Sequence, residues 1–258
     1  MITPKFILSA FALAAFLAPN VQAAVLNLGT NGSGFVNGAF FSVNRNRPTG
    51  TGVFNPFLTI QANGDQQGYN SSIGNFDTKR EPQWNHEIRF SDLQQTTING
   101  IAYFGFSVDV NEPNSPNRST ISLERLQIFT SATLQTSTLM DASGNFNGSL
   151  GILRYDLDFG GNNSVLYDDR NSGSGSGDID IFIPVSFFAG TQSNDYVYMY
   201  QLWGNSDGMS SGGFEETRLI AGITPIPEIG SFFPIIGLMV AVSATHVLRR
   251  RKMAKTAE

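Results

Sequence analysis

Residues 178–184 read Asp178-Ile179-Asp180-Ile181-Phe182-Ile183-Pro184. In an extended backbone the three isoleucines share one face, while Asp178, Asp180 and Phe182 share the other. A period of two is typical of a β-strand with one face in a core, and β-branched isoleucine favours strand. The stretch therefore predicts a strand, and the rest of the chain can be searched for the same period.

Short runs of this kind recur along the chain, with Gly, Asn, Ser and Asp between them, and almost none has a helical period. So many short strands with turn signals predict an all-β fold with a single β-sandwich or jelly-roll domain. The ten predicted strands are Val25–Leu28, Ala39–Val43, Phe57–Gln61, Glu87–Phe90, Ile101–Val110, Ile121–Phe129, Ile152–Phe159, Ile179–Pro184, Tyr196–Trp203 and Phe214–Ile220.

Two local features refine this reading. In Ile121–Phe129 the first apolar residues are out of phase with Leu126 and Ile128, and a β-bulge between Glu124 and Arg125 would restore the phase. Asn99-Gly100 precedes the apolar run from Ile101, and this dipeptide favours a tight hairpin turn.

The N-terminus has the pattern of a secretory signal peptide. Lys5 precedes an apolar stretch over 6–17, and Val21-Gln22-Ala23 supplies small residues at a cleavage site. We expect residues 1–23 to be removed by cleavage after Ala23, or one residue later after Ala24. The protein is therefore expected to be exported.

The C-terminus has the pattern of a membrane anchor. Residues 230–248 carry no fixed charge, and nineteen residues at about 1.5 Å rise would nearly cross a bilayer core of about 30 Å. The basic residues of 249–258 predict a short cytoplasmic tail. Residues 223–229 hold two prolines and predict a linker. This leaves residues 24–222 as the ectodomain.

The order of parts at this end resembles the PEP-CTERM sorting signal of bacterial surface proteins. Its short motif corresponds to Pro227, Glu228 and Ile229, its span to 230–248 and its basic end to Arg249, Arg250 and Arg251. The resemblance implies processing by an exosortase, a membrane enzyme that cuts near the motif. Ile229 stands where that family has a second proline, so an uncut C-terminal membrane anchor is the alternative.

The body is also similar to a recurring ectodomain of PEP-CTERM proteins. The similarity rests on short motifs such as Asn55-Pro56-Phe57-Leu58, Asp195-Tyr196-Val197-Tyr198 and Gly213-Phe214-Glu215-Glu216. It implies a protein of the cell surface or extracellular matrix, and it supplies no biochemical activity that could be assigned to this chain.

Composition narrows the function classes. The chain has no cysteine, which excludes disulfides and thiol chemistry. The body carries 10 Lys and Arg against 19 Asp and Glu, a net charge near −9. Because nucleic-acid affinity depends on cations that contact phosphates, we expect no nucleic-acid partner.

No catalytic constellation stands out. The body has one histidine, His86, and no Gly-x-Ser-x-Gly motif. Glu215 and Glu216 are adjacent, but neighbours on a strand point to opposite faces and cannot converge on one glycosidic bond. The sequence therefore predicts a non-enzymatic protein, with a hydrolase as the least favoured alternative.

Acidic loops supply the metal candidates. Calcium takes several carboxylate and carbonyl oxygens, and two pairs of carboxylates flank the Gly-Ser stretch over 172–177. A second candidate is the stretch 109–112, Asp-Val-Asn-Glu. Solvated acidic loops without metal are the alternative in both places. The first candidate site comprises Asp168, Asp169, Asp178 and Asp180.

Aromatic residues supply the carbohydrate candidates. Tyr196, Tyr198 and Tyr200 share one face of their predicted strand, and with Trp203 and Trp84 they could form a sugar-stacking platform. Ordinary cross-strand packing is the alternative. The second function hypothesis is therefore a carbohydrate-binding module for extracellular polysaccharide, with or without calcium.

Overall fold

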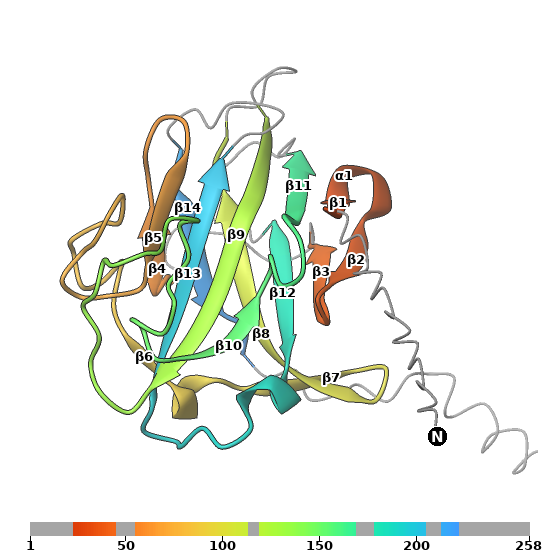
Figure 1. Cartoon of the computed structure of the whole chain (residues 1–258). Coiled ribbons are helices and arrows are strands. Elements are labelled where there is room, and N and C mark those ends of the chain that lie inside the picture. The colour runs from red at the N-terminus through yellow and green to blue at the C-terminus, as the bar shows by residue number, and fades with distance from the viewer. Residues whose placement is uncertain (1–22, 45–54, 113–118, 169–177, 205–212, 222–258) are drawn as a thin grey trace, which may run out of the picture.

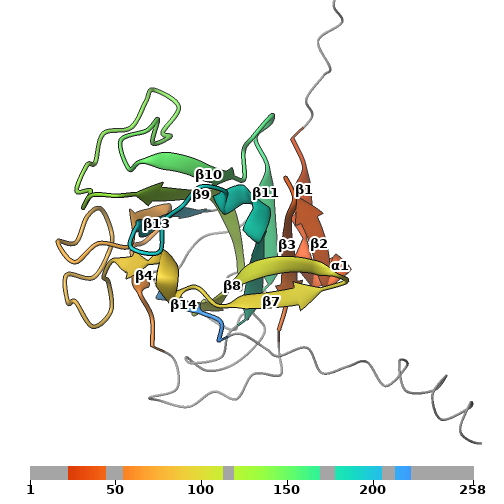
Figure 2. The same cartoon turned by 90° about the horizontal axis from the view of Figure 1, so that it is seen from below.

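The computed structural model describes residues 23–44, 55–112, 119–168, 178–204 and 213–221. These residues form an all-β fold in which two sheets face each other, the arrangement of a β-sandwich (Figures 1 and 2). Residues 1–22, Asp169, and the predicted linker, span and tail from 223 onward lie outside the described residues. Within the described ranges no helix is long and apolar enough to cross a membrane.

The first sheet has seven strands. Its main order is β1-β11-β9-β13-β5, with β10 paired to β9 and β6 paired to β13. The pairing of β1 with β11 is parallel, and the other pairings are antiparallel. The strands are β1 (Val25–Asn27), β5 (Gln66–Tyr69), β6 (Ile88–Arg89), β9 (Thr120–Ser131), β10 (Ile152–Asp156), β11 (Ser164–Asp168) and β13 (Tyr196–Gly204).

The second sheet also has seven strands, all antiparallel. Its main order is β2-β3-β12-β8-β14-β4, with β7 paired to β8. Short helical turns α1 (Leu28–Asn31), η1 (Phe90–Asp92) and η2 (Val185–Phe188) connect strands. The strands are β2 (Ser33–Val36), β3 (Ala39–Val43), β4 (Leu58–Ile60), β7 (Gln95–Ile98), β8 (Ile101–Val110), β12 (Ile179–Pro184) and β14 (Glu215–Leu219).

All ten predicted strands are confirmed, with small changes at their ends, and β2, β5, β7 and β11 were missed. The predicted hairpin is confirmed, because Ile98 pairs with Ile101 across Asn99-Gly100. Both turn residues have positive φ, at 50° and 80°, which suits Asn and Gly. Asn37-Gly38 makes an equivalent turn between β2 and β3.

The predicted β-bulge is confirmed in β9. Leu202 of β13 lies opposite Arg125, whereas Trp203 lies opposite Leu123, so Glu124 is the extra residue. The bulge lets Leu123 and Leu126 both face the core despite their odd spacing.

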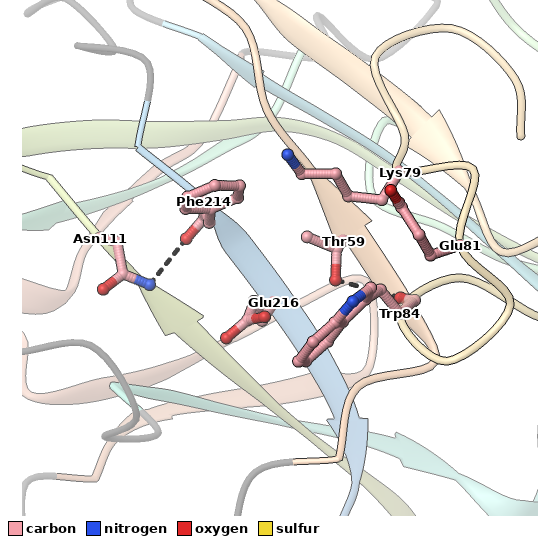
Figure 3. Close-up of a pocket in the computed structure, with 7 residues that line it drawn as sticks. All are labelled: Thr59, Lys79, Glu81, Trp84, Asn111, Phe214 and Glu216. Carbon is pink, nitrogen blue, oxygen red and sulfur yellow. Dashed lines mark hydrogen bonds between the residues drawn. The ribbon is translucent and has the colours of Figure 1, made fainter. Parts of the chain in front are cut away.

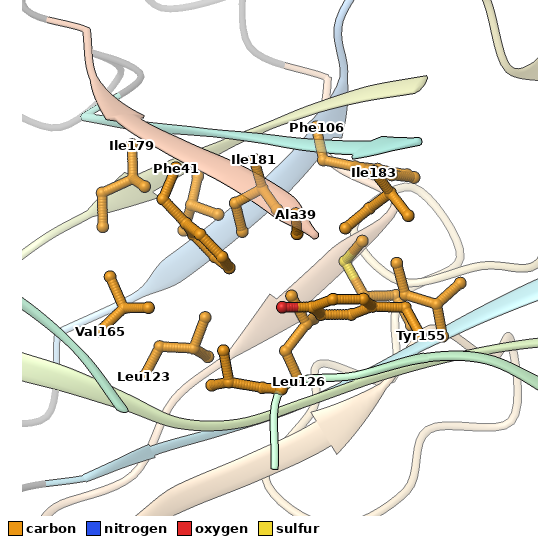
Figure 4. Packing of buried hydrophobic residues seen from close by; sticks show 14 of the residues in the cluster. Ala39, Phe41, Phe106, Leu123, Leu126, Tyr155, Val165, Ile179, Ile181 and Ile183 are labelled. Carbon is orange, nitrogen blue, oxygen red and sulfur yellow. The ribbon is translucent and has the colours of Figure 1, made fainter. Parts of the chain in front are cut away.

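The main core lies between the two sheets (Figure 4). Ile179, Ile181 and Ile183 all point into it, as their spacing predicted. Each buried side chain of this size contributes about 1.5–3 kcal/mol through removal from water. The Tyr155 hydroxyl, on β10, donates to the Val36 carbonyl of β2 at 2.9 Å and so ties the sheets together.

Candidate functional site

A pocket of about 390 Å³ opens on the outer face of the second sheet, near the edge formed by β4 (Figure 3). It lies between β14, the end of β8 and the segment 79–85. Its walls combine two aromatic rings with one cation, two carboxyls and two neutral polar side chains. The lining residues are Thr59, Lys79, Glu81, Trp84, Asn111, Phe214 and Glu216.

Backbone hydrogen bonds hold the Trp84 side of the pocket. Lys79 N–H donates to the Thr59 carbonyl at 3.2 Å, and His86 N–H donates to the Phe57 carbonyl at 3.0 Å. Between them, the Thr59 hydroxyl donates to the Trp84 carbonyl at 3.0 Å. The segment is therefore anchored at both ends, to β4 and to the residue before it, and Trp84 stays 39 % exposed.

The Phe214 side is fixed as firmly. The Asn111 side-chain amide donates to the Phe214 carbonyl at 2.9 Å. Gly213 lies so close to Asn111 that any Cβ would collide with the Asn111 carbonyl oxygen. Phe214 is also 39 % exposed, and the Lys79 ammonium lies 4.4 Å from the centroid of its ring. This is the range of a cation–π interaction.

The adjacent glutamates diverge, as strand geometry predicted. Glu216 faces the pocket and pairs with Thr59 of β4 and Asp109 of β8 in the ladder. Partial burial raises the pKa of its carboxyl. Glu215 faces the interior and has no exposed surface.

The predicted sugar-stacking platform is wrong for the first sheet. Trp203 is fully buried in the main core, and its indole N–H donates to the Gln201 side chain at 2.9 Å. Tyr198 and Tyr200 are buried in a second apolar cluster beneath the segment 132–150. Tyr196 is partly buried, with the Arg89 guanidinium 3.4 Å from its ring centroid. None of these rings offers an open face to a sugar.

The tyrosine hydroxyls have structural partners. The Tyr198 hydroxyl accepts from Gln135 N–H at 2.8 Å, and the Tyr200 hydroxyl donates to the Gln67 side chain at 2.7 Å. Burial raises the pKa of both phenols to about 12. This face therefore holds its covering segment in place.

The acidic candidates are bound within the fold. Asp178 accepts from Val110 N–H at 3.0 Å and from the Tyr167 hydroxyl at 3.1 Å. Asp180 accepts from Asn44 at 2.7 Å, and Asp168 accepts from Ser119 at 2.7 Å. Asp169 lies outside the described residues.

The second acidic stretch is divided between two environments. Asp109 and Glu112 are buried, whereas Asn111 lines the pocket. In the part of the chain that the structure describes, no group of three His, Asp or Glu side chains is arranged to hold a metal ion.

Comparison of the chain with protein-family models, with curated sequences and with solved structures finds no match. The pocket must therefore be interpreted from its own residues. Sequence reasoning had singled out Trp84 as a possible sugar contact but missed Phe214, Lys79 and Thr59. The order Phe-Glu-Glu at 214–216 held the signal, because alternation places Phe214 and Glu216 on one face.

Proposed function

We propose that the chain is an exported, non-enzymatic protein of the bacterial surface or extracellular matrix. Support comes from the two ends of the sequence, which resemble a signal peptide and a PEP-CTERM sorting signal with its exosortase site. In this proposal the sandwich is the single ectodomain, and residues 230–248 form the transmembrane helix that retains it until processing.

We further propose that the ectodomain binds extracellular polysaccharide in the pocket of Trp84 and Phe214. The observation that carries this proposal is the pair of exposed rings beside a carboxyl and an amide. Flat aromatic rings offer apolar contact to the faces of a sugar, and nearby polar groups can bind its hydroxyls. We therefore place the proposed carbohydrate site on the outer face of the second sheet, and no longer on the first sheet.

A hydrolase is supported less well. Hydrolysis of a glycosidic bond needs two carboxyls on either side of that bond. The adjacent pair Glu215 and Glu216 is split between the interior and the pocket. Glu81 is the other carboxyl that lines the pocket, and its side chain is exposed at the rim.

Affinity electrophoresis in gels containing matrix polysaccharide tests the binding proposal. Trp84→Ala and Phe214→Ala should each abolish the retardation of the protein without unfolding it. Phe159→Ala is the matched control, because Phe159 is 76 % exposed and follows β10, remote from the β4 edge. Equal retardation of all three variants and the wild type would refute the pocket as the binding site.

A further inference from the structure

The pocket contains more acidic than basic side chains, and these side chains differ in the contacts that they already make. Two carboxyls, Glu81 and Glu216, face one ammonium, that of Lys79. The ammonium is already engaged, because it donates to the Gln61 side chain at 2.8 Å and lies over the Phe214 ring. The engaged cation leaves the carboxyls as the groups available to a ligand.

Glu216 is the more constrained of these carboxyls. Its neighbours across the ladder are Thr59, whose hydroxyl donates to the Trp84 carbonyl, and Asp109, which is also acidic. Arg218 is next on the same face of β14 but does not line the pocket. Partial burial raises the pKa of Glu216, because loss of hydration disfavours the charged carboxylate.

We infer that the pocket recognises an amino sugar, with the ligand's ammonium at the Glu216 carboxylate and its ring against Trp84 and Phe214. This inference rests on the proposed binding of polysaccharide. An ammonium would supply both the charge and the hydrogen-bond donors that a partly dehydrated carboxylate lacks. A pocket of about 390 Å³ is in the range of small-ligand sites. A uronic acid would place its carboxylate against Glu81 and Glu216.

The test is titration calorimetry at pH 6.5 with three oligosaccharides. A glucosamine hexamer is compared with its N-acetylated form, which has the same linkage and no charge, and with a galacturonate hexamer. We expect the glucosamine hexamer to bind about tenfold more tightly than the N-acetylated hexamer, since a hydrogen bond to a charged group is worth about that factor. The galacturonate hexamer should bind most weakly.

Glu216→Gln should remove the preference for the amine and leave binding of the N-acetylated hexamer unchanged. Asp65→Asn is the matched control, because Asp65 is an exposed acid that does not line the pocket. Equal binding of the two glucosamine-based hexamers, or a preference that survives Glu216→Gln, would overturn the inference and leave polysaccharide binding standing. Binding of none of the hexamers, together with equal retardation in the polysaccharide gels, would overturn both. Binding of a lysine-rich peptide in place of the hexamers would identify a protein ligand and also contradict it.

Discussion

Glu215 places a carboxyl group in the interior of the sandwich, directly behind the pocket. Burial raises its pKa well above the usual range, and the negative charge of Glu112 adds to the rise, while the Gln66 side chain opposes it. The folded protein therefore holds a proton on Glu215 at a pH where the unfolded chain has released it.

This difference predicts how stability depends on pH. Below the usual glutamate pKa of about 4.3, Glu215 is protonated in both states and its contribution to stability is fully present. As pH rises towards the raised folded pKa, the free energy of unfolding should fall by up to about 1.4 kcal/mol per pH unit from this group. Glu215→Gln should remove that part of the slope, so the variant should match the wild type near pH 4 and exceed it at pH 7.

Urea unfolding between pH 4 and pH 8 measures this effect. Asp65→Asn, which removes an exposed acid, should leave the slope unchanged. Parallel stability curves for the wild type and Glu215→Gln would show that Glu215 is ionised in the folded protein.

For single residues, the sequence predicted which face of a strand a side chain occupies, but not how deeply that side chain is buried. The alternation of a strand separates Glu215 from Glu216, and it groups Tyr196, Tyr198 and Tyr200 on one face. It does not reveal what covers a face. The tyrosines are buried because the segment 132–150, which has no strand pattern of its own, packs over them.

The segment 132–150 acts as a third layer over the first sheet, and Phe146 is its main anchor. The Phe146 ring is fully buried, with centroids 5.0 Å from Tyr200 and 5.5 Å from Tyr69. Its N–H donates to the Gln127 side chain at 3.1 Å. Phe146→Ala should lower the free energy of unfolding by about 3–5 kcal/mol, because truncation leaves a cavity among these rings.

Denaturant unfolding checks this value, and Leu139→Ala is the control from the same segment. Leu139 is 76 % exposed, so its truncation should change stability by no more than about 0.5 kcal/mol. Similar losses in the two variants would mean that the segment is not a packed layer.

Among the strands, prediction succeeded where side chains alternate and failed where backbone pairing alone makes the strand. β5 contains Gln66, Gln67 and Gly68, and β7 begins with polar Gln95, Thr96 and Thr97, so neither has an apolar period. β2 could have been found, because Asn37-Gly38 carries the same turn signal as Asn99-Gly100.

In the whole molecule, the pocket joins segments that are far apart in the sequence: 59, 79–84, 111 and 214–216. No local spacing connects them, since the strand order β8-β14-β4 places 59, 111 and 214–216 side by side, and backbone hydrogen bonds hold 79–84 against β4. The class of fold was therefore accessible from the sequence, while the position of the site was not.

The proposed processing of the two ends would decide where this molecule acts. Ala24 N–H donates to the Asn163 side chain at 2.9 Å, and the Ala24 carbonyl accepts from Ser164 N–H at 3.0 Å. Ala23 is exposed and precedes these contacts. Cleavage after Ala23 would keep both contacts, whereas cleavage after Ala24 would remove them along with that residue. We therefore expect the exported protein to begin at Ala24.

Intact mass and fractionation of the protein from its own host test the processing of both ends. We expect a mass that begins at Ala24 and ends near Pro227–Ile229, found in the matrix or medium, because the proposed sorting motif lies between the ectodomain and the proposed span. Replacing Arg249, Arg250 and Arg251 with Ala should then leave uncut protein in the membrane, since in the proposed topology these cations hold the tail in the cytoplasm. Asp65→Asn is the control: the mass lost between its full-length chain and its processed form should be the same as in the wild type. A wild-type mass that runs to Glu258 in the membrane fraction would instead establish a permanent anchor, and Ile229 would explain why the exosortase does not cut.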